Sequence, residues 1–148
     1  MKQFHSIRLT VFVKEGEDKQ AIAARLKALV PLDLEQQKIA VMREQVTSAE
    51  NKPMAVLSIT LENEKHTAAF LQWLRNALTA EQKQLLLTQA PTRLDQGLNF
   101  FLRFDKERWL DGELQITDSG KCFHCKMSLA TYPAKWEIGL EKIKELLS

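Results

Sequence analysis

The sequence predicts an α+β fold in two layers, in which a mostly antiparallel or mixed sheet of about six strands carries its helices on one face. Three observations favour this class. Several segments alternate apolar and polar residues with a period of two, which is typical of strands that bury one face. Other segments repeat apolar residues at helical spacing. Half of the predicted strands follow another strand directly, as antiparallel neighbours do.

The first strand is predicted over Phe4–Lys14, where the alternation is clearest. Asp18 follows a break in this pattern and can cap a helix, which continues at helical spacing until Pro31 ends it. Two further strands are predicted over Lys38–Thr47 and Met54–Leu61, the second of which is rich in apolar and β-branched residues.

Two helices are predicted next. The first covers Glu64–Leu78 and carries one apolar stripe. The second covers Ala80–Gln89, with Leu85 and Leu86 expected to be buried. Pro91 should stop this helix, because proline lacks the amide hydrogen that the helical ladder needs.

The last third of the chain is dense in strands. Alternation predicts strands over Leu98–Asp105, Leu114–Thr117 and Cys122–Leu129. The last two are joined by a short turn in which Gly120 is expected to take a positive φ. A final helix over Trp136–Leu147 has an apolar stripe that should lie against the sheet. With no linker between these elements, residues 1–148 are expected to form a single domain.

The composition is that of an ordinary globular domain. The 148 residues are 45% hydrophobic and 27% charged, and Lys plus Arg exceed Asp plus Glu by only 21 to 19. No apolar run approaches the roughly 18 residues of a membrane span, and the first residues lack the apolar region of a signal peptide. We therefore expect a cytoplasmic protein without a membrane partner. An RNA site would require basic residues segregated onto one face.

Sequence motifs give no support for an enzyme or a cofactor. The five glycines form no dinucleotide, P-loop or nucleophile-elbow motif. Cys122 and Cys125 form a C-x-x-C motif around His124, yet residues i and i+3 of a strand project to opposite faces. We therefore expect no metal on this motif, with Cys125 in the core and Cys122 and His124 on the outer face.

The outer face of the sheet holds the most informative residues. If the apolar positions of each strand face the helices, the opposite positions combine basic residues with aromatic rings. Ammonium and guanidinium groups hold phosphates, and aromatic or histidine rings stack on unpaired bases. The predicted RNA-binding residues, with those of the flanking loops, are Arg8, Phe12, Lys14, Phe101, Arg103, Lys106, Arg108, His124, Lys126 and Lys135.

Other interpretations of the same residues stay open at this point. The face can be an ordinary solvated surface, or it can bind a protein partner in an RNA-processing or translation assembly. A small enzyme that uses His124 and the neighbouring thiols is a third interpretation. Salt dependence separates RNA from a protein partner, because phosphate contacts weaken steeply with salt and an apolar interface does not.

Several short motifs, in order along nearly the whole chain, give the sequence a family resemblance. The motifs are Gly16-Glu17-Asp18, Leu26 and Leu29 before Pro31, Asn51-Lys52-Pro53, Arg93-Leu94-Asp95, Leu102-Arg103-Phe104-Asp105-Lys106, Gly112-Glu113-Leu114, and Lys126-Met127-Ser128-Leu129 with Ala130-Thr131-Tyr132-Pro133-Ala134-Lys135. In these motifs the chain resembles archaeal RNA-binding proteins described as predicted exosome-associated subunits. The fold of that family is similar to that of the ribosomal protein that binds 5S rRNA.

The resemblance implies RNA binding without catalysis. It also implies an RNA-processing, exosome-associated or ribosome-related setting. Its motifs are strand and turn signatures, so it names no catalytic residue and no cofactor.

Overall fold

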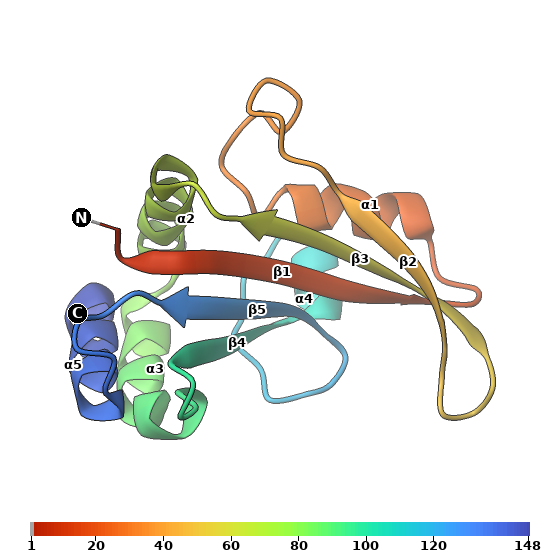
Figure 1. Cartoon of the computed structure of the whole chain (residues 1–148). Coiled ribbons are helices and arrows are strands. Elements are labelled where there is room, and N and C mark those ends of the chain that lie inside the picture. The colour runs from red at the N-terminus through yellow and green to blue at the C-terminus, as the bar shows by residue number, and fades with distance from the viewer. Residues whose placement is uncertain (1) are drawn as a thin grey trace.

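The computed structural model of the chain describes residues 2–148, and its centre is a single antiparallel sheet of five strands (Figure 1). The strands are β1 (Phe4–Lys14), β2 (Met42–Thr47), β3 (Pro53–Leu61), β4 (Asn99–Asp105) and β5 (Cys122–Leu129). Their spatial order is β2-β3-β1-β5-β4, so the first strand is central and pairs with both β3 and β5. The predicted α+β class with an antiparallel sheet is confirmed.

In the described part of the chain, five helices accompany the sheet, and Figure 1 shows their arrangement. They are α1 (Lys19–Lys27), α2 (Glu64–Ala77), α3 (Ala80–Arg93), α4 (Lys106–Leu110) and α5 (Trp136–Leu147). Asp18 caps α1 as predicted, because its side chain accepts a hydrogen bond from the amide of Ala21. Asn63 and Thr79 cap α2 and α3 in the same manner.

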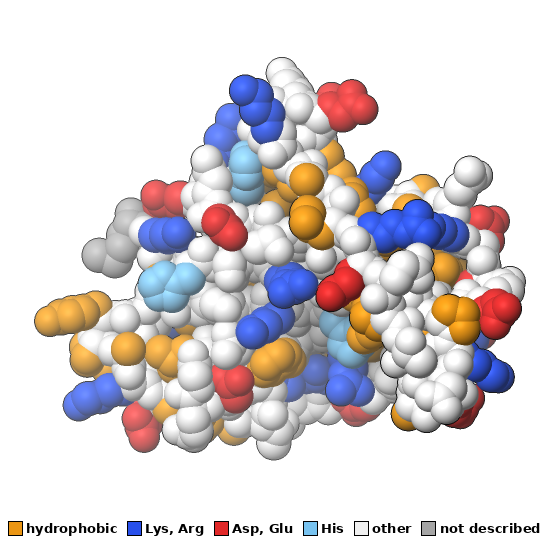
Figure 2. Space-filling model, turned by 45° about the vertical axis from the view of Figure 1, so that its right-hand side comes forward, with side chains coloured by type: hydrophobic (Ala, Val, Ile, Leu, Met, Phe, Trp, Pro, Cys, Tyr) orange, Lys and Arg blue, Asp and Glu red, His pale blue; other side chains and the backbone are white. Residues whose placement is uncertain are grey.

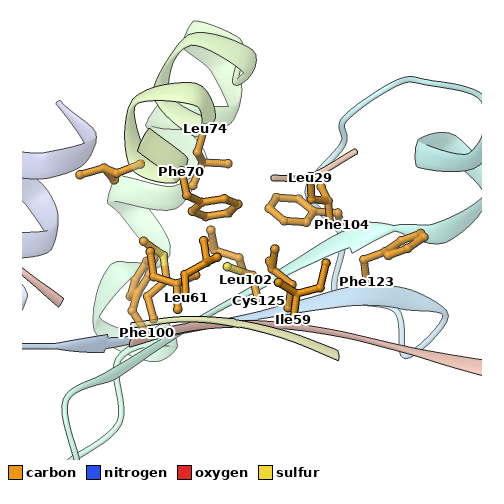
Figure 3. Packing of buried hydrophobic residues seen from close by; sticks show 14 of the residues in the cluster. Leu29, Ile59, Leu61, Phe70, Leu74, Phe100, Leu102, Phe104, Phe123 and Cys125 are labelled. Carbon is orange, nitrogen blue, oxygen red and sulfur yellow. The ribbon is translucent and has the colours of Figure 1, made fainter. Parts of the chain in front are cut away.

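The hydrophobic core lies between the helices and one face of the sheet (Figure 3). Phe70 and Leu74 of α2 point toward Leu61, Leu102 and Cys125 of the strands in this view. All five side chains are buried, and the opposite face of the sheet is left open. We call this uncovered side the open face.

The sheet has one strand fewer than the sequence predicts. Within residues 2–148, the segment predicted as a strand over Leu114–Thr117 makes only an isolated bridge between Ile116 and Phe104. The turn expectation at Gly120 is also wrong, since the glycines with positive φ are Gly16 and Gly112. Residues 115–117 run beside β4 instead of forming a hairpin with β5.

Details of α3 also differ from the prediction. Leu86 is fully buried, but Leu85 is 40% exposed, because Leu86 and Ala90 form the inward i, i+4 stripe and Leu85 lies about 100° away from it. Pro91 does not end the helix. It removes one ladder hydrogen bond, but a later one, from the amide of Leu94 to the carbonyl of Ala90, still forms.

The C-terminal helix closes one end of the core. Ile143 is buried as expected, whereas Trp136 is half-buried and donates a hydrogen bond from Nε1 to the carbonyl oxygen of Leu94 at 3.0 Å. Gly139 allows α5 to lie close to Leu98, because a Cβ atom at position 139 would lie 2.7 Å from Cδ2 of Leu98. The stripe of α5 therefore packs largely on α3 and the β4 end of the sheet.

We expect Trp136→Ala to lower the free energy of unfolding by about 3 kcal/mol, because it removes a large ring from the edge of the core. Trp136→Phe should cost about 1 kcal/mol, mainly through the lost hydrogen bond. Urea denaturation followed by circular dichroism measures both, with Glu137→Ala on the exposed side of α5 as the control. Equal losses for Trp136→Ala and Glu137→Ala would contradict this packing.

Candidate nucleic-acid interface

The open face is organised in cross-strand rows of side chains, set by the register of the sheet. In the first row, Phe101 of β4 lies beside Lys126 of β5, which lies beside Arg8 of β1. In the second row, Arg103 lies beside His124, which lies beside Thr10. Figure 2 shows Lys and Arg side chains gathered over the middle of this face, with hydrophobic and acidic side chains among them.

The first row opposes two cations. Arg8 and Lys126 are both exposed, and neither side chain makes a hydrogen bond or an ion pair within residues 2–148. The pKa of the nearby Asp95 carboxyl is lowered, mainly by the amide of Asn99 and least by the charge of Lys126. Like charges directly opposite each other across two strands destabilise a sheet. The row therefore carries two cations that form no ion pair within residues 2–148, and the Asp95 carboxyl offsets only part of their charge.

The side chains of the second row have more contacts within the protein than those of the first row. Nη1 of Arg103 donates a hydrogen bond to the carbonyl oxygen of Asp118 at 3.0 Å, which holds the guanidinium at the edge of the face. Burial lowers the pKa of His124, and the charge of Arg103 lowers it further. Both effects favour the neutral form of the His124 ring. Its Nε2 lies 3.5 Å from Sγ of Cys122.

Aromatic rings flank both rows. Phe101 is 41% exposed, which is unusual for a ring of this size in a strand. Phe12 is half-buried and meets His124 edge to face, with ring centroids 5.8 Å apart and an interplanar angle of 83°. The predicted placement of Phe12, Phe101 and His124 on one face together with Arg8, Arg103 and Lys126 is thus what the structure shows.

Lys106 corrects the expectation of an exposed loop lysine. It begins α4, a five-residue helix that is capped by Asp105 and too short for periodicity to reveal. Its side chain is 4% exposed, and Nζ donates to the carbonyl oxygen of Phe12 at 2.7 Å and to Oε1 of Glu17 at 3.0 Å. Lys106 therefore fixes the end of β1 and is not a free phosphate ligand.

The other predicted flanking residues lie outside the two rows. Arg108 is on α4 and pairs with Glu113 at 3.2 Å, with both side chains exposed. Lys135 is the residue at the start of α5, beyond β5. Lys14 is exposed at the far end of β1, where it lies beside Met54 of β3. The structure thus brings Lys14 onto the open face but leaves Arg108 and Lys135 at its margins.

Two contributions to the open face were not predicted. Arg8 lines a shallow hollow with Met42 and Glu44 of β2, and Met42 is 62% exposed. Lys121, in the loop before β5, lines a second hollow near Phe12. The weak alternation of β2 and the position of Lys121 in a loop gave no signal in the sequence that could have placed them there.

The two cysteines lie on opposite faces of β5, as their spacing predicts. Both are free and buried, and burial raises the pKa of each thiol. Cys125 belongs to the core, while Cys122 shares the open face with His124. Within residues 2–148, no group of three or more His, Cys, Asp or Glu side chains is arranged to hold a metal ion. Of the helices described, none has the length and apolar character needed to cross a membrane.

Comparison with known proteins identifies the family. A family model described as RNA binding matches residues 6–129, which include the whole of both rows. The chain belongs to this RNA-binding family. It is similar to the RNA-binding protein PAB1135 of Pyrococcus abyssi, with 23% identity over 145 residues that cover 98% of this chain and 94% of the relative.

Solved structures of archaeal proteins share the fold of this RNA-binding family member. AF2318 from Archaeglobus fulgidus, a DUF54 protein, superposes with a TM-score of 0.88 at 24% identity over 97% of this chain and 99% of that one. Mth689 from Methanothermobacter thermautotrophicus, also a DUF54 protein, gives a TM-score of 0.80 at 24% identity over 99% of this chain and 100% of that one. At this identity the likeness establishes the fold alone.

The Glu17–Lys106 pair should make the fold sensitive to acid. Burial raises the pKa of Glu17, but the Lys14 amide and the Lys106 ammonium outweigh this effect and hold it below its ordinary 4.5. A lowered folded-state pKa adds stability that is complete above about pH 4.5 and is lost as the pH falls through the folded value. We therefore expect the free energy of unfolding to decline below about pH 4.5.

Glu17→Gln should lower the free energy of unfolding at neutral pH by roughly 1–3 kcal/mol, since it leaves a buried ammonium without its counter-ion. It should also flatten the acid-dependent decline. Urea denaturation from about pH 7 to about pH 3 compares wild type with Glu17→Gln and with Glu15→Gln at an exposed neighbour. The same pH dependence in wild type and Glu17→Gln would contradict this role for the pair.

Proposed function

We propose that the protein binds RNA without catalysis, on the open face of its sheet. The observation that carries this proposal is the first row, where Arg8 and Lys126 oppose each other and neither forms an ion pair with any residue from 2 to 148. Like charges directly opposite each other on neighbouring strands lower the stability of a sheet, and a bound polyanion would restore that stability. Phosphates along an RNA strand supply that negative charge.

The rings beside the row favour unpaired bases as the second point of contact. Phe101 lies next to Lys126, so one nucleotide can place its phosphate on the ammonium and its base on the ring. Phe12 and the neutral His124 ring offer a second stacking surface across the sheet. Double-stranded RNA hides its base faces, so we propose a single-stranded segment or a loop as the ligand.

The remaining cations take graded roles in this proposal. Arg103 keeps donors beyond the one held by Asp118 and can contact a phosphate at the edge of the face. Lys14 extends the positively charged surface of the open face to the far end of β1. Lys135 adds positive charge at the margin, which helps encounter more than affinity, whereas the charge of Arg108 is offset by Glu113.

The comparisons support this proposal at the level of the family. The family is one of RNA-binding proteins, and the Pyrococcus abyssi relative is itself named an RNA-binding protein. An exosome-associated or ribosome-related setting, in the cytoplasm, comes from the resemblance in sequence motifs. Direct binding assays with purified archaeal exosome subunits test that setting separately from RNA binding.

Removing the charge of Lys126, which lies opposite Arg8, should raise the stability of the fold and lower its affinity for RNA. We expect Lys126→Gln to raise the free energy of unfolding by about 0.5 kcal/mol, because it relieves the repulsion from Arg8. It should also weaken binding to an oligoribonucleotide roughly tenfold and reduce the salt slope by about one phosphate contact. Fluorescence anisotropy at two salt concentrations, together with urea denaturation, measures both effects.

Lys144→Gln is the matched control, because Lys144 is an exposed lysine of α5 and its removal changes the net charge equally. Its affinity for the oligoribonucleotide should change less than about twofold, since α5 lies in the helical layer. Equal losses for the two variants would indicate diffuse electrostatic binding. An unchanged affinity in Lys126→Gln would favour a protein partner on the open face.

Phe101→Leu should test the stacking contact on its own. We expect it to weaken binding of an unpaired oligoribonucleotide by about 1–3 kcal/mol while the salt slope stays the same, since no phosphate contact is lost. An abasic oligonucleotide of the same length serves as the control ligand, and its affinity should be unaffected. If Phe101→Leu weakened both ligands equally, the ring would have a structural role instead.

A further inference from the structure

A hollow of about 250 Å³ lies where the open face ends, between β1, β3 and the loop that precedes β5. Phe12 and Met54 line it from neighbouring strands, and Cys122 lines it from β5. These three side chains make its surface largely apolar. A flat, neutral ring with a small apolar area fits such walls better than a charged group does.

The polar groups of the hollow come from the Glu17–Lys106 pair. An ammonium group has three N–H donors, and within the described chain the Lys106 ammonium spends two of them, on the carbonyl oxygen of Phe12 and on Oε1 of Glu17. Oε1 of Glu17 also accepts the amide of Lys14, whereas Oε2 makes no hydrogen bond within residues 2–148. One N–H donor of Lys106 and one carboxylate oxygen of Glu17 thus remain without a partner within residues 2–148, on side chains whose Nζ and Oε1 atoms lie 3.0 Å apart.

The pairing edge of a nucleobase forms hydrogen bonds with a donor and an acceptor that lie next to each other. Each of the four bases presents a ring nitrogen or carbonyl acceptor beside an N–H donor on its pairing edge. The ammonium of Lys106 can donate to the acceptor while the free carboxylate oxygen of Glu17 accepts from the neighbouring N–H. Both groups are held by other contacts, so little side-chain entropy is lost on binding.

The charge balance argues against a phosphate in the same place. The ammonium of Lys106 is neutralised by Glu17 at 3.0 Å, and that of Lys121 by Glu107 at 2.7 Å. A carboxylate among apolar walls would repel a phosphate. Among the described residues 2–148, Lys14 has no ion-pair partner, and it lines both this hollow and a larger one of about 650 Å³ beside it. The larger hollow leaves room for the sugar and phosphate of the same nucleotide.

We propose that this hollow is a pocket for one unpaired nucleobase. The base would lie between Phe12 and Met54, and its pairing edge would form hydrogen bonds with Lys106 and Glu17. The proposal deepens the RNA-binding function proposed above and rests on it. It makes Lys106, a residue that holds no phosphate, a base-contacting residue. It also places the end of the RNA track at the turn between β1 and α1.

Titration of the ¹⁵N-labelled full chain with each of the four nucleoside 5′-monophosphates tests the pocket, with ribose 5-phosphate as the probe that lacks a base. We expect at least one monophosphate to shift the amides of Met54, Lys106 and Gly120 saturably, and to bind about tenfold tighter than ribose 5-phosphate. Equal binding of ribose 5-phosphate, or shifts confined to Phe101 and Lys126, would overturn the pocket.

The double variant Glu17→Gln with Lys106→Met removes the polar pair without leaving an unpaired buried charge. It should weaken monophosphate binding about tenfold, with Lys144→Gln unchanged as the control. Full retention of binding by the double variant would overturn the proposed hydrogen bonds of Lys106 and Glu17 with the base edge. If the double variant does not fold, the comparison of the wild-type titrations decides.

Binding of a longer oligoribonucleotide separates the two proposals. If the pocket fails while the oligoribonucleotide still binds and depends on Lys126, only the pocket is wrong. If no oligoribonucleotide binds, the proposed function itself fails.

Discussion

One-sided burial of the central strand constrains everything else in the structure. Helices cover one face of β1, so Ile7, Leu9, Val11 and Val13 are buried while the alternate residues face outward. A shift of one residue in register would move Arg8 and its neighbours into the core. The register with β3 and β5 is therefore fixed by hydrophobic burial, and the same register sets the rows of the open face.

This coupling explains how much of the site could be predicted from the sequence. Strict alternation in β1, β4 and β5 was enough to place Arg8, Phe101, Arg103 and Lys126 on a common face. What alternation cannot give is the neighbour across the sheet, because pairing depends on the order of strands in space. The opposition of Arg8 to Lys126 follows only from the antiparallel pairing of β1 with β5.

The errors share a different cause, which is tertiary contact between short or ambiguous segments. Lys106 lies in a run of charged residues that is typical of a solvated loop, yet the carbonyl of Phe12 and the carboxylate of Glu17 make burial of its ammonium favourable. Leu85 and Leu86 are adjacent leucines, and only the packing of α3 decides which of them is buried. Neither outcome is encoded in local periodicity.

RNA is proposed to lie on the open face and not on the helical layer. Photo-crosslinking of an oligoribonucleotide that contains 4-thiouridine, followed by mass spectrometry of the crosslinked peptides, tests this placement most directly. We predict crosslinks in the peptides of β1, β4 and β5, with Phe12 and Phe101 as the main positions. Crosslinks concentrated in α2, α3 or α5 would contradict the account.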